Sequence, residues 1–304
     1  MSSKIIAVVI SFNPNIEMLN AEYESIAFQV EKIIYIDNFS DNREIVRKWI
    51  EEKPKAVAIW MNSNEGVGVS QNAGIRLALA EGASHIIIFD QDSLVSNDFV
   101  EKLYYAEQLA INEGVNVGIT GPIYVSHDDL YEYPIMSIED GKFVRIPTNS
   151  FATYRKVSHI IASGSLIRRE VFEKVGLLTE SLFIGYMDHE YCFRSSYFGY
   201  DTIVTKVACM KHQLGDRQII LFGRKIGVYS PFRRYFDCRN TILIQKNEYL
   251  PKVFRRHYLK LIFGKFILSC LIGPNRLKQV KYCLIGFNDG LKGVHGKCTI
   301  TNKK

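Results

Sequence analysis

The chain has 304 residues, of which 47% are hydrophobic and 23% are charged, so the composition indicates a globular protein of one large domain, or of one domain with an appendage. The six cysteines are scattered without a Cys-x-x-Cys pair, which argues against a disulfide framework or a zinc site and favours reduced thiols. The net charge of +6 hides an asymmetry, because residues 249–304 carry twelve Lys and Arg against the single acid Asp289, whereas the remainder carries 26 basic and 31 acidic residues.

The first half of the chain alternates predicted strands with predicted helices. Apolar runs predict strands at Lys4–Phe12, Lys32–Asp37, Val57–Asn62, Ile86–Phe89 and Val117–Val125. Helices are predicted at 15–30, at Asp41–Glu52 with Asp41 as its N-cap, at Gly66–Ala80 and at Ser96–Asn112. This rhythm predicts an α/β fold with a doubly wound sheet and right-handed crossovers.

The middle of the chain is less regular. Residues 126–158 are rich in Tyr, Pro, Asp and Ser, and Glu139–Lys142 resembles a hairpin turn. A short helix is expected near Glu170–Val175, a second helix around Asp188, and a strand over Thr202–His212. Because no repeat or low-complexity linker interrupts it, we treat 1–248 as one domain with halves at 1–125 and 126–248, followed by a basic helical tail at 249–304.

The tail predicts an anionic partner. Residues 251–288 contain no Asp or Glu, and the apolar stretch Leu261–Gly273 is shorter than the roughly 20 residues that a membrane span needs. A basic, aromatic-bearing pair of helices lying on an anionic membrane surface fits this composition. The alternatives are a helical pair packed on the body or in a homodimer, and a nucleic-acid-binding arm. No nucleic-acid motif accompanies the charge, so we expect no nucleic-acid partner.

Polar residues follow four of the predicted strands, which places them along one edge of the sheet, as in nucleotide sites. They are Ser11 and Asn13; Asp37 and Asn38; Asn64 and Gly66; and Asp90, Gln91 and Asp92. Asp90 and Asp92 can hold a hard divalent cation, the usual partner of a diphosphate, although two such acids can also simply cap the next helix. The glycines at 66, 68 and 74 do not follow the Gly-x-Gly-x-x-Gly order after the first strand, which disfavours a dinucleotide site.

These motifs resemble the family-2 inverting glycosyltransferases with the GT-A fold, a Rossmann-like mixed sheet with flanking helices. The resemblance rests on Asp37-Asn-Phe-Ser40, Asn64-Glu-Gly66-Val-Gly68, Asn72-Ala-Gly74, Phe89-Asp-Gln-Asp-Ser93, Ser163-Gly-Ser165 and the stretch from Phe183 to Arg194. The motif Phe89–Ser93, which contains Gln91, most resembles that of the dTDP-L-rhamnose-dependent rhamnosyltransferases of bacterial surface polysaccharides. Gly185 and Tyr191 depart from the related pattern, which has an acid and a Trp at these places, so acceptor identity stays open.

The resemblance implies a role for each residue. Asp37 contacts the pyrimidine base beside Ser11 and Asn13, Asp92 binds Mg²⁺ or Mn²⁺, and Asp188 is the general base. Further nucleotide-sugar contacts are implied for Asn38, Asn64, Gly66, Asn72, Asp90 and Gln91, further metal contacts for Asp90 and His212, and a place near the acceptor or donor sugar for Ser163, Gly164, Glu190 and Arg239.

Several of these residues have plain structural alternatives. Asp188 and Glu190 lie two positions apart and point roughly 200° away from each other on a helix, so only one faces the acceptor. The other can pair with Arg194, four residues along from Glu190. His212 can be a core histidine, and Arg239 a structural ion-pair partner.

The leading hypothesis is a cytoplasmic enzyme at the inner membrane surface that moves L-rhamnose from dTDP-β-L-rhamnose to a lipid-linked oligosaccharide during O-antigen, capsule or cell-wall polysaccharide assembly. The nearest alternative keeps the mechanism and uses a UDP-hexose or UDP-N-acetylhexosamine donor. A metal-dependent hydrolase and a non-catalytic glycan-binding or partner-binding module are further alternatives.

Overall fold

The computed structural model describes residues 3–126, 131–211, 217–221, 224–272, 275–298 and 300. A mixed sheet of nine strands forms the centre, with the order β3-β2-β1-β4-β10-β6-β11-β5 and β9 paired with β11. Its strands are β1 (Ile5–Ser11), β2 (Lys32–Asp37), β3 (Ala56–Trp60), β4 (His85–Asp90), β5 (Leu94–Val95), β6 (Val117–Val125), β9 (Tyr154–Val157), β10 (Ser165–Arg168) and β11 (Asp201–Lys211).

The first four strands in the sheet are parallel, so their polar carboxyl ends meet at one edge as the sequence predicts. β10 breaks the parallel order, because it runs antiparallel to both β4 and β6. The structure is therefore a mixed sheet, and β10 brings Ser163 and Gly164, which precede it, beside the end of β4.

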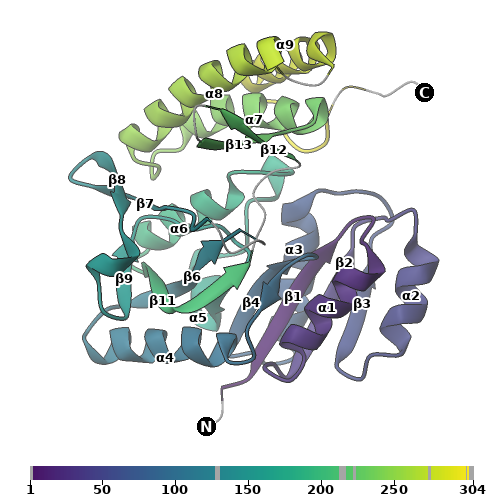
Figure 1. The fold of residues 1–304 in the computed structure, drawn as a ribbon, viewed down its shortest axis with the longest axis vertical. Coiled ribbons are helices and arrows are strands. Elements are labelled where there is room, and N and C mark those ends of the chain that lie inside the picture. Colours follow the sequence, from purple (N-terminus) through teal and green to yellow (C-terminus); the bar gives the residue numbers. More distant parts are fainter. Residues whose placement is uncertain are drawn as a thin grey trace.

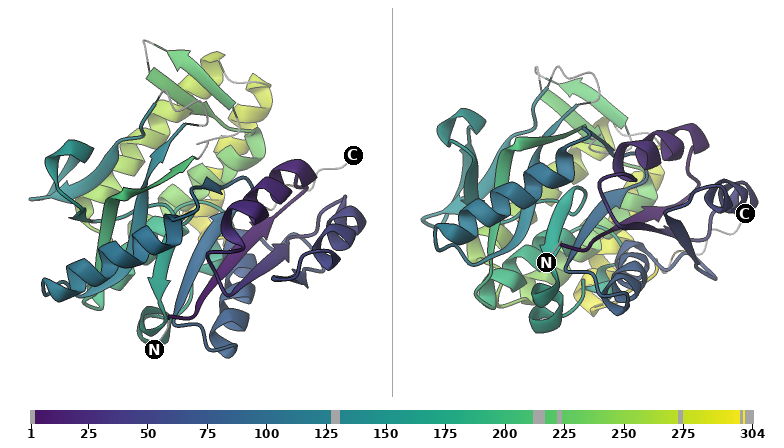
Figure 2. Two further views of the ribbon diagram at one scale, coloured as in Figure 1. Left: turned by 60° about the horizontal axis from the view of Figure 1, so that its bottom comes forward. Right: turned by 90° about the horizontal axis from the view of Figure 1, so that it is seen from below.

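Helices cover both faces of the sheet (Figures 1 and 2). One face carries α1 (Ile16–Ile26), α2 (Arg43–Glu51) and α4 (Phe99–Asn112), and the other carries α3 (Val67–Ala80), α5 (Arg169–Val175) and α6 (Met187–Tyr197). The alternation of side chains along β1 explains both layers, since Ile6 and Val8 enter one core cluster, and Ala7 and Val9 enter the other. The predicted double winding is confirmed.

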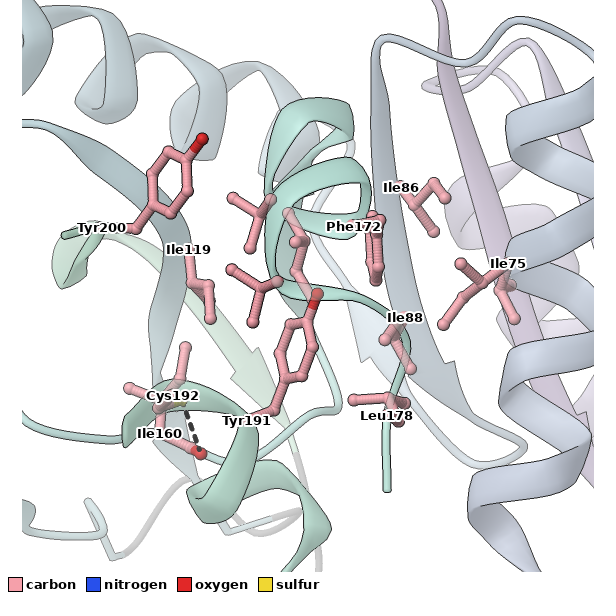
Figure 3. Close-up of a cluster of buried hydrophobic side chains, with 14 of the residues drawn as sticks. Ile75, Ile86, Ile88, Ile119, Ile160, Phe172, Leu178, Tyr191, Cys192 and Tyr200 are labelled. Atoms are coloured by element: carbon pink, nitrogen blue, oxygen red, sulfur yellow. Dashed lines mark hydrogen bonds between the residues drawn. The ribbon is translucent and has the colours of Figure 1, made fainter. Parts of the chain in front are cut away.

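The core beneath α5 and α6 fixes the position of the second half against the first. Figure 3 shows Ile86 and Ile88 of β4 facing Ile75 of α3 on one side and Phe172 of α5 on the other. Tyr191 of α6 stacks on Phe172, with ring centroids 5.8 Å apart. Because α6 is anchored by this buried aromatic pair, the residues at its N-terminus have a fixed place relative to β4.

The carboxyl ends of β1, β2 and β4 point toward a layer of three helices (Figure 1). This layer consists of α7 (Pro231–Leu243), α8 (Lys252–Ile272) and α9 (Arg276–Lys292). α7 and α9 approach closely at Gly286, where a Cβ atom would lie 2.4 Å from the Tyr235 carbonyl oxygen. The predicted helical pair is confirmed. It packs on α7, in agreement with the alternative of a helical pair packed on the body, although the helix α7 itself was not predicted.

Two hairpins complete the chain: β7 (Ile135–Glu139) with β8 (Lys142–Ile146), and β12 (Arg217–Leu221) with β13 (Arg224–Val228). The first confirms the predicted turn, with Asp140 and Gly141 at φ of 47° and 70°. Several predicted boundaries were wrong, among them the end of the first helix, which stops at Ile26 and not at residue 30, and the start of the second. α2 begins at Arg43 and not after Asp41, because the Asp41 carboxylate accepts a hydrogen bond from the Asn13 amide at 3.3 Å instead of capping the helix.

Candidate active site

Asp37 ends β2 and is buried at the polar edge of the sheet. Its Oδ1 accepts hydrogen bonds from the Ser40 N–H (3.1 Å) and from Arg43 Nε (2.9 Å). Its Oδ2 has no hydrogen-bond partner among the described residues. A buried carboxylate oxygen without a partner is costly, and a donor from a ligand, such as the N–H of a pyrimidine base, would satisfy it.

Asn38 and Asn64 join the ends of β2 and β3. The Asn38 amide donates to Asn64 Oδ1 (3.1 Å), and its own Oδ1 accepts from the Glu65 N–H (3.0 Å). The chain then turns at Gly66, where φ is 89° and a Cβ atom would lie 2.6 Å from the Phe183 carbonyl oxygen. Glycine is required at this position, because it lets the first half of the chain contact the segment that leads to Asp188.

The loop after β1 is hydrogen-bonded to the loops after β2 and β4. Several of the residues involved are ones for which the resemblance implies contact with the nucleotide. The Asn13 N–H donates to Ser40 Oγ (2.8 Å), and Gln91 Oε1 accepts from the Phe12 N–H (2.7 Å). Ser11 Oγ reaches the Ile36 carbonyl at 3.4 Å. All four strand ends that the sequence predicted to meet are therefore connected into one rim.

Asp90 and Asp92 lie on a tight turn closed by the Ser93 N–H, which donates to the Asp90 carbonyl (3.1 Å). The Asp90 N–H donates to Ser163 Oγ (3.1 Å), which fixes the turn against the residues before β10. Neither acid caps the next helix, since α4 begins at Phe99 with Asp98 as its N-cap residue. The helix-capping alternative is therefore wrong for this pair.

Asp188 stands in the first turn of α6, where the helix dipole favours a negative charge. Its Oδ1 accepts a hydrogen bond from the His189 N–H (2.9 Å). The residues before it are held in left-handed backbone conformations, with φ of 64° at Phe183 and 68° at Tyr186. Non-glycine residues keep such conformations only where the surrounding structure fixes them, and here they orient the start of α6.

Tyr124 of β6 is hydrogen-bonded to the segment that holds the acid turn. Its hydroxyl donates to the Ser163 carbonyl (2.9 Å). Burial raises the pKa of Tyr124 well above its ordinary value, and the nearby charges of Asp188 and Asp90 raise it further. Both carboxylates therefore act electrostatically on one phenol group. The sequence did not reveal this residue, because nothing marks a tyrosine inside a strand as part of a site.

Glu190 has a structural role in this helix, as the partner of Arg194. It is 1% exposed, pairs with Arg194 through Oε1 and Nε at 2.8 Å, and accepts hydrogen bonds from the hydroxyls of Thr179 and Tyr249. Of the two acids in this helix, only Asp188 is left partly exposed. The expectation that the two point in different directions is confirmed.

Asn72 and Arg239, for which the resemblance implies contacts with the substrates, are also placed inside the protein. Asn72 is fully buried, and its amide bonds the backbone of Leu178 in both directions, at 2.9 and 3.0 Å. Arg239 is fully buried too, and its guanidinium donates to the carbonyls of Gly296 and Leu182. Each side chain joins segments that are distant in sequence, so neither is available to a substrate in this conformation.

The described residues contain no group of three or more His, Cys, Asp or Glu side chains arranged to hold a metal ion. His212, a predicted metal contact, lies outside the described residues. The Asp92 carboxylate forms no hydrogen bond or ion pair with any described residue. A free carboxylate beside Asp90 fits Mg²⁺ or Mn²⁺, which commonly take one or two protein carboxylates and complete their shell with water and substrate phosphate.

Glu22 of α1 is a third acid in this region, and the sequence analysis missed it. It is fully buried, and both of its carboxyl oxygens lack a hydrogen-bond partner among the described residues. Burial raises its pKa well above the ordinary value, and the charges of Asp92 and Asp90 raise it further. A buried, unpaired carboxyl in an otherwise apolar helix face is the signal that could have revealed it.

We expect Glu22→Gln to make the protein more stable at pH 8 than the wild type and to matter little at pH 5. A carboxyl whose pKa is raised by folding holds more protons in the folded chain, so the free energy of unfolding falls as the pH rises above the unfolded pKa, by up to about 1.4 kcal/mol per pH unit. Urea unfolding in the presence of a chelator, at pH values from 5 to 8, measures this slope. A wild-type slope that survives in the variant would rule out Glu22 as its source.

The mixed α/β sheet with its flanking helices matches the fold of the GT-A glycosyltransferases. Residues 7–176 match the model for glycosyl transferase family 2. The chain belongs to this family and is a glycosyltransferase.

Curated relatives extend the likeness over almost the whole chain. The chain is 32% identical to the dTDP-rhamnosyl transferase RfbF of Shigella flexneri, across 97% of this chain and 98% of that protein. It is 21% identical to the low-salt glycan biosynthesis hexosyltransferase Agl10 of Haloferax volcanii, across 88% of this chain and 85% of that protein.

Two solved structures share the fold at low identity. GalNAc-T7 with UDP, GalNAc and Mn²⁺ has a TM-score of 0.60 at 14% identity, covering 96% of this chain, which spans 56% of that chain. Residues 1–349 of S. aureus TarS in complex with UDP-GlcNAc have a TM-score of 0.55 at 13% identity, covering 96% of this chain and 81% of that one. They support the fold alone.

Proposed function

We propose that this enzyme transfers L-rhamnose from dTDP-β-L-rhamnose to a hydroxyl of a lipid-linked glycan, with inversion at the anomeric carbon. The observation that carries the proposal is the rim of hydrogen-bonded strand ends, in which the loops after β1, β2, β3 and β4 are joined to one another and the Asp90 N–H is held by Ser163. Asp188, at the start of α6, is near enough to this rim that its charge and that of Asp90 both raise the pKa of Tyr124. The donor is proposed from the likeness to the Shigella protein named as a dTDP-rhamnosyl transferase. Gln91, within the phrase Phe89–Ser93, supports the same donor by resemblance.

In this proposal the reaction is a single displacement. The acceptor oxygen attacks the anomeric carbon while the bond from that carbon to the diphosphate oxygen breaks, and the hydroxyl proton passes to the Asp188 carboxylate. Asp37, with its free Oδ2, and the pair of Asn38 and Asn64 hold the nucleotide. Mg²⁺ or Mn²⁺, when bound at Asp92 and Asp90, supplies positive charge for the departing dTDP.

We expect dTDP with Mn²⁺ to raise the unfolding temperature more than UDP with Mn²⁺ does at equal concentration. A ligand that binds only the folded protein stabilises it in proportion to its affinity, so the larger shift identifies the true nucleotide. A larger shift with UDP would replace the proposed donor by a UDP-sugar. Transfer of labelled rhamnose to a lipid-linked acceptor then tests the reaction itself.

We further propose that the enzyme works at the surface of an anionic membrane, on its cytoplasmic side. In the described part of the chain, no helix is both long and apolar enough to cross a bilayer. α9 instead carries three exposed leucines at intervals of seven residues: Leu277 (88% exposed), Leu284 (56%) and Leu291 (71%). This spacing puts them on one face of the helix. The only acid in α8 and α9, Asp289, is buried, so the exposed charges of both helices are positive.

We expect the double variant Leu277→Ser, Leu284→Ser to weaken binding to phosphatidylglycerol vesicles by about tenfold or more, because burial of each leucine in the interface contributes roughly 1.5–3 kcal/mol. Ile45→Ser, which removes an exposed apolar side chain from α2, should leave vesicle binding unchanged. Vesicle flotation measures both. Equal binding by the double variant and the wild type would contradict the membrane-surface proposal.

A further inference from the structure

A basic pocket lies between the β7–β8 hairpin and the beginning of α8, apart from the rim that holds the nucleotide. Its volume is about 900 Å³, and its lining includes Lys142 from the hairpin and Lys252, Arg256, His257 and Lys260 from α8. None of its lining residues is acidic. Figure 1 shows the hairpin beside the first turns of α8, and the ring centroids of Phe143 and His257 lie 4.1 Å apart.

No acidic side chain in the described part of the chain is paired with the cations of this pocket. The side chains of Lys142, Lys252 and Lys260 are exposed and, like that of Arg256, form no ion pair or hydrogen bond with the described residues. Of the two acids at the hairpin turn, Glu139 is paired with Arg155 at 3.0 Å, and Asp140 is exposed and outside the lining of the pocket. Four like charges around one cavity repel one another, and this repulsion is relieved when an anion binds among them.

The geometry favours a phosphate-bearing ligand. Lys252 lies in the first turn of α8, where unpaired backbone N–H groups and the helix dipole add to the attraction for an anion, and Arg256 and Lys260 follow in the next two turns. Lys and Arg together are the usual ligands of phosphate oxygens. The remaining walls are apolar, from Ile138, Phe143, Pro251 and Val253, and they suit a hydrocarbon that continues from the phosphate.

The pocket also adjoins the acceptor side of the site. Tyr258 follows His257 on α8, and its ring lies 5.9 Å from the ring of His189 and 5.2 Å from that of Tyr186. His189 follows Asp188 directly, and Tyr186 lies two residues before it. Tyr258, next to the pocket residue His257, therefore packs against both sides of the chain segment that carries the proposed base.

We propose that this pocket binds the diphosphate of a polyprenyl-diphosphate-linked acceptor, with the first isoprene units on Phe143 and Val253 and the glycan directed past Tyr258 toward Asp188. The identity of the ligand as the acceptor rests on the proposed function. The affinity for a prenyl diphosphate rests on the pocket itself and can be measured without any donor sugar.

Calorimetry on the full chain with farnesyl diphosphate tests the proposal. The variant Lys252→Gln, Lys260→Gln should weaken binding by about tenfold or more, since each charge-assisted contact contributes roughly 1.5–3 kcal/mol. Lys142→Gln, on a different element, should weaken binding as well. The matched control Lys48→Gln, Lys246→Gln removes two exposed, unpaired lysines outside the pocket and should bind like the wild type. All these lysines are exposed, and an unchanged unfolding temperature verifies the fold of each variant.

Three outcomes would overturn the proposal: a pocket variant that binds farnesyl diphosphate like the wild type, a control that loses as much affinity as the pocket variant, or farnesol binding as tightly as the diphosphate. Inorganic diphosphate binding as tightly as farnesyl diphosphate would reduce the pocket to a site for free phosphate. A loss confined to phosphatidylglycerol vesicles would assign it to a lipid headgroup. Pocket-dependent binding in a protein that transfers no rhamnose would support the pocket and reject the donor.

Discussion

Replacing Asp188 by Asn is expected to lower kcat by about 10²–10⁴-fold, the usual contribution of a general base, while the affinity for dTDP stays unchanged. The amide has nearly the same shape, and its Oδ1 can still accept the hydrogen bond from the His189 N–H that holds the carboxylate at 2.9 Å. It cannot accept the acceptor's proton. The variant therefore removes the chemistry of the side chain and keeps its place at the start of α6. Steady-state kinetics with dTDP-rhamnose and calorimetry with dTDP measure the two effects separately.

Glu190→Gln is the matched comparison, because it alters the other acid of the same helix. Glu190 is buried and holds Arg194, Thr179 and Tyr249, so its loss should lower the free energy of unfolding by about 3 kcal/mol, as for other broken buried pairs. At a temperature where this variant is folded, kcat should stay near the wild-type value. Full activity in the Asp188 variant, or the larger catalytic loss in the Glu190 variant, would move the base assignment away from Asp188.

The arrangement of the first half of the chain could be predicted because consecutive parallel strands end at the same edge of a sheet. The apolar runs before Asp37 and Asp90 mark two such strands, and the structure brings their ends together as expected. The reversed strand β10 could not be predicted, since a strand of four residues has too little periodicity to be recognised and its antiparallel pairing depends on distant partners.

The candidate site also contains some residues that could be predicted from the sequence and others that could not. Residues in loops after strands, such as Asn38 and Asn64, could be identified because turn-forming polar residues stand out against apolar runs. Tyr124 could not, because it belongs to a regular strand and its position near the acids comes from packing across the sheet. Glu22 is marked in the sequence only as an acid among the apolar residues of one helix face. Asn72 is the opposite case. Its position in a motif predicted a contact with the nucleotide sugar, whereas in the structure its buried amide links α3 to the backbone of Leu178.

The charge distribution around the acid turn leads to the second major prediction. Glu22, Asp90 and Asp92 gather near one another, and Asp92 has no cationic partner among the described residues. Such a cluster lowers stability when it is left uncompensated, and a divalent cation with a diphosphate would compensate it. Asp92→Asn should therefore raise the unfolding temperature in chelator while damaging function, which is the exchange of stability for activity that functional sites show.

Asp92→Asn is expected to abolish the gain in dTDP affinity that Mn²⁺ gives the wild type, and to lower the transfer rate by about 100-fold or more, since metal stabilisation of a leaving diphosphate amounts to several kcal/mol. Calorimetry with dTDP, in Mn²⁺ and in chelator, isolates the metal-dependent part from the contacts of Asp37 and Asn38. Asp98→Asn removes an equal charge at the start of α4, where the carboxylate pairs with Lys102 at 2.8 Å, and should retain the whole Mn²⁺ effect. If the Asp92 variant also keeps the Mn²⁺-dependent gain, Asp92 is not a metal ligand and the diphosphate is held by other groups.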